Sequence, residues 1–205
     1  MKGQASVLTM VIMTAMALII SLALWNLFMS TASIQSEQAL TASTLARESA
    51  RVSVVALSSV KVNNAAYRFA FQVTTLDYQP VTIYLMVLYS VTTSPRPASF
   101  TLYEVENAPA DITSASTLTL IPNTTARTEI AEADYVMIRP VNSNEYAPLS
   151  IYYTSSVTMY RLLLNGVPKC IVVEVPTSLV NNQAQLTVLI KISNRYYQIT
   201  ALPLS

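Results

Sequence analysis

The chain has 205 residues, with 12 Lys and Arg against 11 Asp and Glu, no His and one Cys, and 52% of it is hydrophobic. A formal net charge of +1 gives no electrostatic attraction to nucleic-acid phosphates, so we expect no nucleic-acid partner. The lack of His and the single Cys exclude a His/Cys metal site, a His-based catalytic dyad or triad and an intramolecular disulfide. We therefore predict that the protein is not an enzyme and has no catalytic residues, metal or cofactor.

The charged residues are few and unevenly distributed. They make up 11% of the chain, against about 25% in typical proteins. After Lys2 the next charged residue is Glu37, so residues 4–36 form a run of 33 residues without a charge. Neither Gly nor Pro occurs between Gly3 and Pro80. This composition predicts an uninterrupted helix at the start of the chain.

Residues 5–29 form the apolar part of this helix, with only small or neutral polar interruptions. A helix needs about 20 such residues to span a bilayer, and 25 residues reach about 37 Å. The apolar core of a secretory signal has about 7–15 residues and is shorter. A buried helix of a soluble protein is rarely apolar on every side over about seven turns. We therefore expect a membrane-resident helix.

Two residues indicate its orientation. Lys2 precedes the apolar run, which favours a cytoplasmic N-terminus. Trp25 lies about 33 Å along the helix from Gly3, where interfacial aromatic residues are common. Everything after Ser30 is then expected outside the membrane.

The helical pattern continues beyond the apolar run. Sparse charges accompany it, including an i,i+3 pair between Glu48 and Arg51. We predict one helix from residue 4 to about Leu57, about 80 Å long, within a first region of residues 4–61. Such a helix presents an apolar stripe that requires partners; beyond the membrane the stripe comprises Leu40, Ala46, Ala50, Val54 and Leu57.

Residues 62–205 have the pattern of an all-β domain. Apolar residues alternate with period two from Tyr67, and no helical window follows. We predict an immunoglobulin-like β-sandwich, so the fold class is α+β: a long apolar helix followed by an all-β domain. The predicted strands cover residues 67–73, 81–89, 100–105, 117–121, 135–138, 150–164, 169–175, 185–192 and 196–201.

Three local features of the β domain have candidate roles. Asn165-Gly166 lies between two apolar runs and predicts a type I′ hairpin turn. Cys170 lies in the apolar run that follows, which favours a buried small hydrophobe over a reactive thiol. The acidic residues Glu129, Glu132 and Asp134 flank a turn-like segment, and a solvated loop is favoured over a catalytic carboxylate pair.

The N-terminal motif carries a family resemblance. Lys2-Gly3 stands directly before Gln4-Ala5-Ser6 and an unbroken apolar helix, and this arrangement, with the β domain, resembles an archaeal type IV pilin. The resemblance implies a short leader of residues 1–3, with Lys2, Gly3 and Gln4 as the processing site of a prepilin peptidase that cuts after Gly3. Leu8 then occupies mature position five, where bacterial pilins commonly have Glu, and the helix lacks their Pro. Both departures favour the archaeal branch.

The resemblance also implies an assembly and its partners. Identical subunits bundle their apolar helices into the core of an extracellular filament used for adhesion, with the β domains outside. Before assembly the subunit resides in the cytoplasmic membrane, and assembly needs an ATPase and a membrane platform protein. Asn123, in the sequon Asn123-Thr124-Thr125, is the candidate glycosylation site. The expected filament-core residues are Val7, Leu8, Val11, Ile12, Ala17, Leu18, Ser21, Leu22, Trp25 and Phe28.

Two other functions remain open at this point. One is a single-pass membrane-anchored immunoglobulin-like protein, such as an archaellum stator component. The other is an archaellin, which shares the plan of helix and β domain. The apolar pattern that continues to Leu57 favours the pilin, because a simple anchor does not need it.

Overall fold

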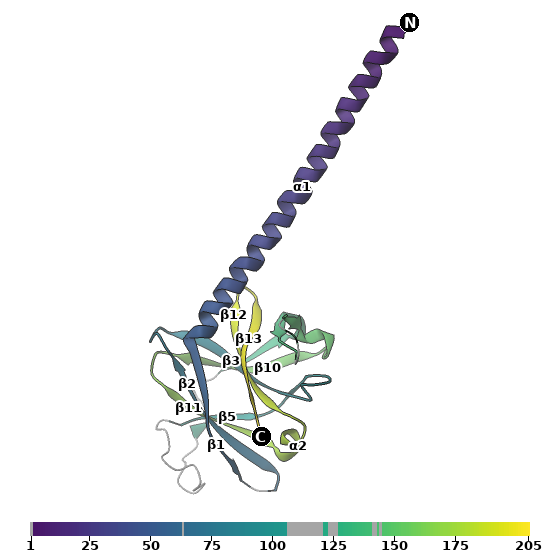
Figure 1. The fold of residues 1–205 in the computed structure, drawn as a ribbon. Coiled ribbons are helices and arrows are strands. Elements are labelled where there is room, and N and C mark those ends of the chain that lie inside the picture. Colours follow the sequence, from purple (N-terminus) through teal and green to yellow (C-terminus); the bar gives the residue numbers. More distant parts are fainter. Residues whose placement is uncertain (1, 63, 106–120, 123–126, 141–142, 144) are drawn as a thin grey trace. The chain divides into compact units, whose positions relative to one another are not determined.

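A computed structural model describes residues 2–62, 64–105, 121–122, 127–140, 143 and 145–205 (Figure 1). The chain divides into two compact units, Met1–Thr44 and Leu45–Ser205. The first unit is helical, and the second consists mainly of two β-sheets. The predicted fold class, a long apolar N-terminal helix followed by an all-β domain, is confirmed.

Helix α1 (Lys2–Arg51) has 50 residues and is about 75 Å long. It runs without a break because no Gly or Pro follows Gly3 in this part of the chain. The prediction that it extends to about Leu57 is wrong, because Val52–Lys61 form strand β1. The side chains of Val52 and Val54 pack against the core of the β unit, and these contacts favour the strand over the helical pattern.

The first sheet contains five strands, all antiparallel to their neighbours. β1 forms one edge and pairs along almost its whole length with β2. The two central strands, β2 and β11, carry most of the large side chains of this sheet that enter the core. The strand order is β1 (Val52–Lys61), β2 (Ala66–Thr75), β11 (Lys169–Pro176), β5 (Thr101–Val105) and β6 (Ile121–Pro122).

The second sheet contains eight strands, and all described pairings are antiparallel except that of β13 with β8. Its order is β7 (Arg127–Glu132), β10 (Ser156–Leu164), β3 (Val81–Tyr89), β12 (Gln185–Ile192), β13 (Arg195–Pro203), β8 (Val136–Ile138) and β9 (Ala147–Pro148). The short strand β4 (Arg96–Ala98) pairs with β3. Three single-turn helices connect strands: Ala133–Tyr135, Leu149–Ile151 and α2 (Thr177–Val180).

Most predicted strands are present. Those expected at residues 81–89 and 185–192 match β3 and β12, and the strand expected at 150–164 begins later, at Ser156. Most of the strand expected at 117–121 lies outside the described residues. The sequence did not predict β1, β4, β7 or β9. The described residues form thirteen strands, against seven to nine in immunoglobulin domains, so the likeness concerns the two-layer arrangement and not the strand number.

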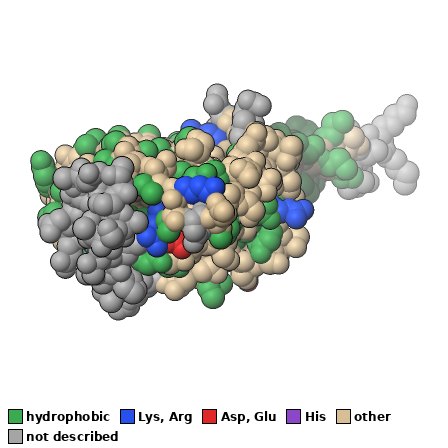
Figure 2. All heavy atoms as spheres, turned by 90° about the horizontal axis from the view of Figure 1, so that it is seen from below, with side chains coloured by type: hydrophobic (Ala, Val, Ile, Leu, Met, Phe, Trp, Pro, Cys, Tyr) green, Lys and Arg blue, Asp and Glu red, His purple; other side chains and the backbone are tan. Residues whose placement is uncertain are grey.

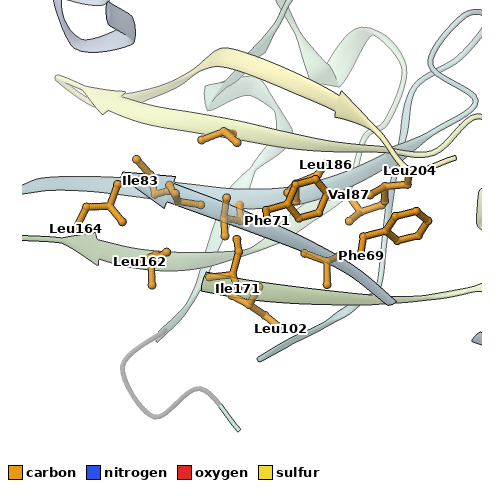
Figure 3. Packing of buried hydrophobic residues seen from close by; sticks show 14 of the residues in the cluster. Phe69, Phe71, Ile83, Val87, Leu102, Leu162, Leu164, Ile171, Leu186 and Leu204 are labelled. Carbon is orange, nitrogen blue, oxygen red and sulfur yellow. The ribbon is translucent and has the colours of Figure 1, made fainter. Parts of the chain in front are cut away.

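The main hydrophobic core lies between the two sheets (Figure 3). Phe69 and Phe71 from β2 and Ile171 from β11 meet Ile83 from β3 and Leu162 from β10. These side chains are at most 4% exposed. Their burial is the main favourable contribution to the stability of the β unit.

A second cluster of buried side chains covers the opposite face of β3. Tyr84, Met86 and Leu88 point to this face, since their neighbours along the strand point into the main core. Ala133 and Leu149, from two of the single-turn helices, cover them. A strand buried on both faces requires a continuous apolar sequence, which explains why residues 81–89 lack polar alternation.

The Asn165-Gly166 segment is not a hairpin. It connects β10 of the second sheet to β11 of the first, and the two strands do not pair with each other. Gly166 has a φ of 85°, so the prediction of a positive φ at this glycine is confirmed while the hairpin is wrong. A Cβ atom on Gly166 would lie 2.7 Å from the carbonyl oxygen of Tyr78, a contact too short for real atoms.

We expect Gly166→Ala to lower the free energy of unfolding by about 1–3 kcal/mol, because it combines a strained φ with this clash. Denaturant unfolding of the full chain in detergent, followed by near-UV circular dichroism, measures it. All 12 tyrosines follow residue 66, so the tyrosine signal reports the β unit. Val167→Ala, at the exposed next position, is the matched control with little expected effect. Equal stabilities for Gly166→Ala and the wild type would contradict the clash.

Thr187 on β12 is fully buried, and its hydroxyl has no hydrogen-bond partner among the described residues. Thr187→Val keeps the shape and removes the unsatisfied group, so we expect the free energy of unfolding to rise by about 1 kcal/mol. Thr187→Ser is the matched control: it keeps the hydroxyl, loses the methyl group and should destabilise the β unit. The same denaturation experiment measures both variants, and a destabilising Thr187→Val would show that the hydroxyl is satisfied.

Candidate functional site

The candidate functional surface is the apolar part of α1, where hydrophobic side chains lie on every side of the helix. Every side chain from residue 9 to residue 40 is exposed. The large hydrophobic side chains in this part range from 48% exposed at Ile12 to 73% at Met10. Consecutive residues of a helix lie about 100° apart, so the run Leu18, Ile19, Ile20 alone covers more than half of the circumference. Within residues 9–29, therefore, hydrophobic side chains lie on every side of the helix.

The structure places the expected filament-core residues as follows. Leu8 lies in α1, but its side chain is outside the described part, as are those of the processing residues Lys2, Gly3 and Gln4. All the others lie on α1 with exposed side chains: Val7, Val11, Ile12, Ala17, Leu18, Ser21, Leu22, Trp25 and Phe28.

The hydroxyl groups within the apolar run do not require water. The Thr14 hydroxyl donates a hydrogen bond to the carbonyl oxygen of Met10, at 2.5 Å, and the Ser21 hydroxyl donates to that of Ala17, at 2.7 Å. The Thr31 hydroxyl donates to the carbonyl oxygen of Leu27 at 2.8 Å. Such internal bonds lower the cost of placing Ser and Thr in an apolar environment. The small polar interruptions of the run are therefore compatible with lipid or with close helix packing.

The helix is long and apolar enough to cross a membrane, and it exceeds what crossing requires. The segment Thr9–Arg51 has 43 residues. Its most apolar part has a mean hydropathy of 2.2 and contains no buried side chain. Its length is about 65 Å, against a hydrocarbon thickness of about 30 Å. Residues 5–29 contain eleven Val, Leu, Ile and Phe. At about 0.3–0.6 kcal/mol each, these favour insertion by about 3–7 kcal/mol.

The last turns of α1 belong to the β unit. Leu45 is buried in the main core. Arg51 donates from Nε to the Asp77 carboxylate at 2.5 Å and from Nη1 to the Glu48 carboxylate at 2.6 Å. The backbone N–H of Leu76 donates to the carbonyl oxygen of Arg51 at 2.8 Å. The predicted Glu48–Arg51 pair is confirmed, and Asp77, in the β2–β3 turn, is a partner that the sequence did not indicate.

The acidic segment is not a solvated loop, because Glu129 and Glu132 lie on strand β7 and Asp134 lies in the single-turn helix Ala133–Tyr135. Glu129 lies on β7, where its carboxylate accepts hydrogen bonds from Lys191, at 3.2 Å, and from the Tyr196 hydroxyl. Desolvation raises the pKa of Glu129, but these hydrogen bonds and the charges of Lys191 and Arg161 outweigh it, so the pKa is below its usual value. The ionised carboxylate of Glu129 therefore connects β7 to β12 and β13.

The other candidate groups have no chemical site around them. Glu132 and Asp134 are exposed. Cys170 is buried, as predicted, and burial raises the pKa of its thiol. Among the described residues, no three His, Cys, Asp or Glu side chains are arranged to hold a metal ion. Asn123, the candidate glycosylation site, lies outside the described residues.

The Arg51–Asp77 pair predicts a pH dependence. Desolvation raises the pKa of the Asp77 carboxyl, but the hydrogen bond from Arg51, with the other contacts of the carboxylate, lowers it below its usual value overall. A carboxyl with a lowered folded-state pKa contributes stability above its unfolded pKa and loses it as the pH falls through the folded value. We expect Asp77→Asn to be less stable than the wild type near neutral pH. As the pH falls below about 4, the usual pKa of an Asp side chain, the difference should shrink, as measured by denaturant unfolding across pH. A difference that is constant with pH would contradict the role of this pair.

Comparison with known proteins gives no relative. No protein-family model, curated protein or solved structure matches the chain. What is proposed below therefore depends on the surface of α1, on the contacts of the β unit and on the N-terminal motif.

Proposed function

We propose that the chain is a structural subunit of an extracellular filament of the archaeal type IV pilus kind, built by packing the α1 helices of identical subunits. One observation carries this proposal. The apolar surface of α1 is exposed on all sides, and the helix is more than twice as long as a bilayer requires.

The energetics favour a bundle once the subunit leaves the membrane. Burying a Val, Leu, Ile or Phe side chain contributes about 1.5–3 kcal/mol, so the eleven in residues 5–29 provide about 15–35 kcal/mol as an upper estimate. Association costs about 4–15 kcal/mol in lost translational and rotational freedom. The burial term exceeds this cost, so α1 in water is expected to pack against other copies of itself.

Inside the bilayer the balance differs, and this sets an order of events. Lipid already covers the apolar side chains, so helices gain little from hydrophobic burial when they associate there. Ala17 and Ser21, one turn apart, allow close approach of a second helix. We infer a membrane-resident subunit first and a filament afterwards, with the prepilin peptidase acting at Lys2, Gly3 and Gln4, and an ATPase and platform protein driving extraction.

The β unit is then the outer surface of the filament. The face drawn in Figure 2 presents mainly uncharged polar atoms and hydrophobic side chains, with few charged groups. Such a surface supports close contacts between neighbouring subunits and with other surfaces, which is compatible with adhesion. Asn123 remains the proposed glycosylation site.

A membrane-anchored β-domain protein is the second candidate, and Trp25 favours it. This side chain is exposed and followed by Asn26, as expected for a residue at the membrane interface. An anchor uses about 20 residues and leaves the rest of α1 in water. The two candidates therefore differ in whether residues beyond about residue 30 are covered.

Leu40 distinguishes the candidates. It lies beyond the apolar run and is 66% exposed in the isolated chain. In a filament core, Leu40→Lys loses the burial of a leucine and introduces a charge, so we expect at least about a tenfold loss of assembled filament. Negative-stain microscopy of material sheared from cells, with antibody labelling of the chain, measures assembly.

The control is Gln38→Lys, which adds the same charge where the replaced residue is already polar and exposed, and it should assemble nearly normally. Labelled filaments in the wild type and their loss in Leu40→Lys support the pilin. Wild-type chain found only in the membrane fraction contradicts it and supports the anchor.

A further inference from the structure

The first sheet ends in an edge that no described residue covers. β1 pairs with β2 on one side and with no described strand on the other. Five consecutive residues in its middle, 55–59, are exposed. A strand in this position presents unpaired backbone N–H and C=O groups that act as a template for another strand.

The second half of this edge has little protection against pairing. Natural sheet edges are usually guarded by Pro, by charged side chains or by a bulge. β1 contains no Pro and one charged residue, Lys61 at its end. A register shift between Ala56 and Ser58 leaves Leu57 without a partner on β2, and residues 58–61 pair regularly after it. Residues 57–61 thus form a short arm at the end of the strand. Leu57, at the start of this arm, is an aliphatic side chain that is 42% exposed.

The same chain carries a second free edge with complementary features. β7 pairs only with β10 among the described strands and forms the edge of the second sheet. It has six residues, one more than the β1 arm. Ile130 on β7 is 71% exposed, and Glu132, at the end of the strand, is exposed as well. The two edges thus offer exposed aliphatic side chains and opposite charges.

We propose that residues 57–61 of β1 pair in parallel with β7 of a neighbouring copy of this chain. Lys61 and Glu132 each lie at the C-terminal end of their strand, so parallel pairing brings these two charges side by side. The same pairing brings Leu57 and Ser59 toward Ile130. Two different edges of one molecule form a heterologous contact, and such contacts build open filaments. The inference rests on the proposed function, because β1 begins directly after α1 and bundling of α1 brings the β units of neighbouring copies close to one another.

A cysteine pair tests this contact in the full chain. Adjacent strands place paired Cα atoms about 5 Å apart, within the range of a disulfide. After mild oxidation of sheared material, Lys61→Cys combined with Glu132→Cys should give a ladder of covalent oligomers on non-reducing gels. Each single variant should give no ladder, and neither should Lys61→Cys with Leu163→Cys, an exposed position on β10, which pairs with a strand on each side. The native Cys170 is buried in every variant.

Microscopy of the same material separates failure of this contact from failure of the proposed function. Filaments without a ladder overturn the edge pairing and leave the filament intact. Chain confined to the membrane without a ladder overturns both, and a ladder in the membrane fraction alone supports the pairing and contradicts the filament.

Charge reversal provides a second test that needs no new thiol. Lys61→Glu and Glu132→Lys each place like charges side by side, so each should lower the shear and heat resistance of the filament. The double variant restores opposite charges and should restore resistance. Three variants equal to the wild type would overturn the pairing of these ends.

Discussion

The apolar surface of α1 is the constraint on which the rest of this molecule depends. Eleven large aliphatic or aromatic side chains among residues 5–29 are exposed on every side of the helix. Water is an unfavourable environment for this surface, so lipid or other protein is needed to cover it. The internal hydrogen bonds of Thr14, Ser21 and Thr31 serve either environment, because they leave few polar groups unsatisfied along the apolar run.

The β unit has a hydrophobic core of its own. Its main core lies between two sheets, and β3 is buried on both faces by a second cluster. Only the last turns of α1 join this unit, through Leu45 and through Arg51, which binds both Glu48 and Asp77. This division leaves the apolar length of α1 available for contacts with other molecules, and it fixes the end of the helix at the first sheet.

The sequence predicted the elements that local composition determines. The absence of Gly and Pro after Gly3 predicted a long helix, and continuous apolar runs predicted β3 and β12. It failed where distant contacts decide the structure. The apolar positions of residues 50–57 fit both a helix and a strand, and pairing with β2 favours the strand.

The predictions for Asn165-Gly166 and for Glu129 were wrong for a related reason. Turn chemistry predicted the positive φ of Gly166, but it does not specify which sheet each flanking strand joins. Acidic residues made β7 resemble a loop, whereas Lys191 and Tyr196, more than 60 residues away, hold Glu129 in the strand. The candidate surface itself was predictable, because a charge-free apolar run of 25 residues is visible in the composition alone.

Electron cryomicroscopy of filaments sheared from cells tests the central claim most directly. The account predicts a helical reconstruction whose core consists of α1 from many copies, with Val11, Leu18 and Phe28 in contact with neighbouring helices. The β units should lie outside this core. Filaments whose core contains another protein, or this chain found only with lipid around α1, would contradict it.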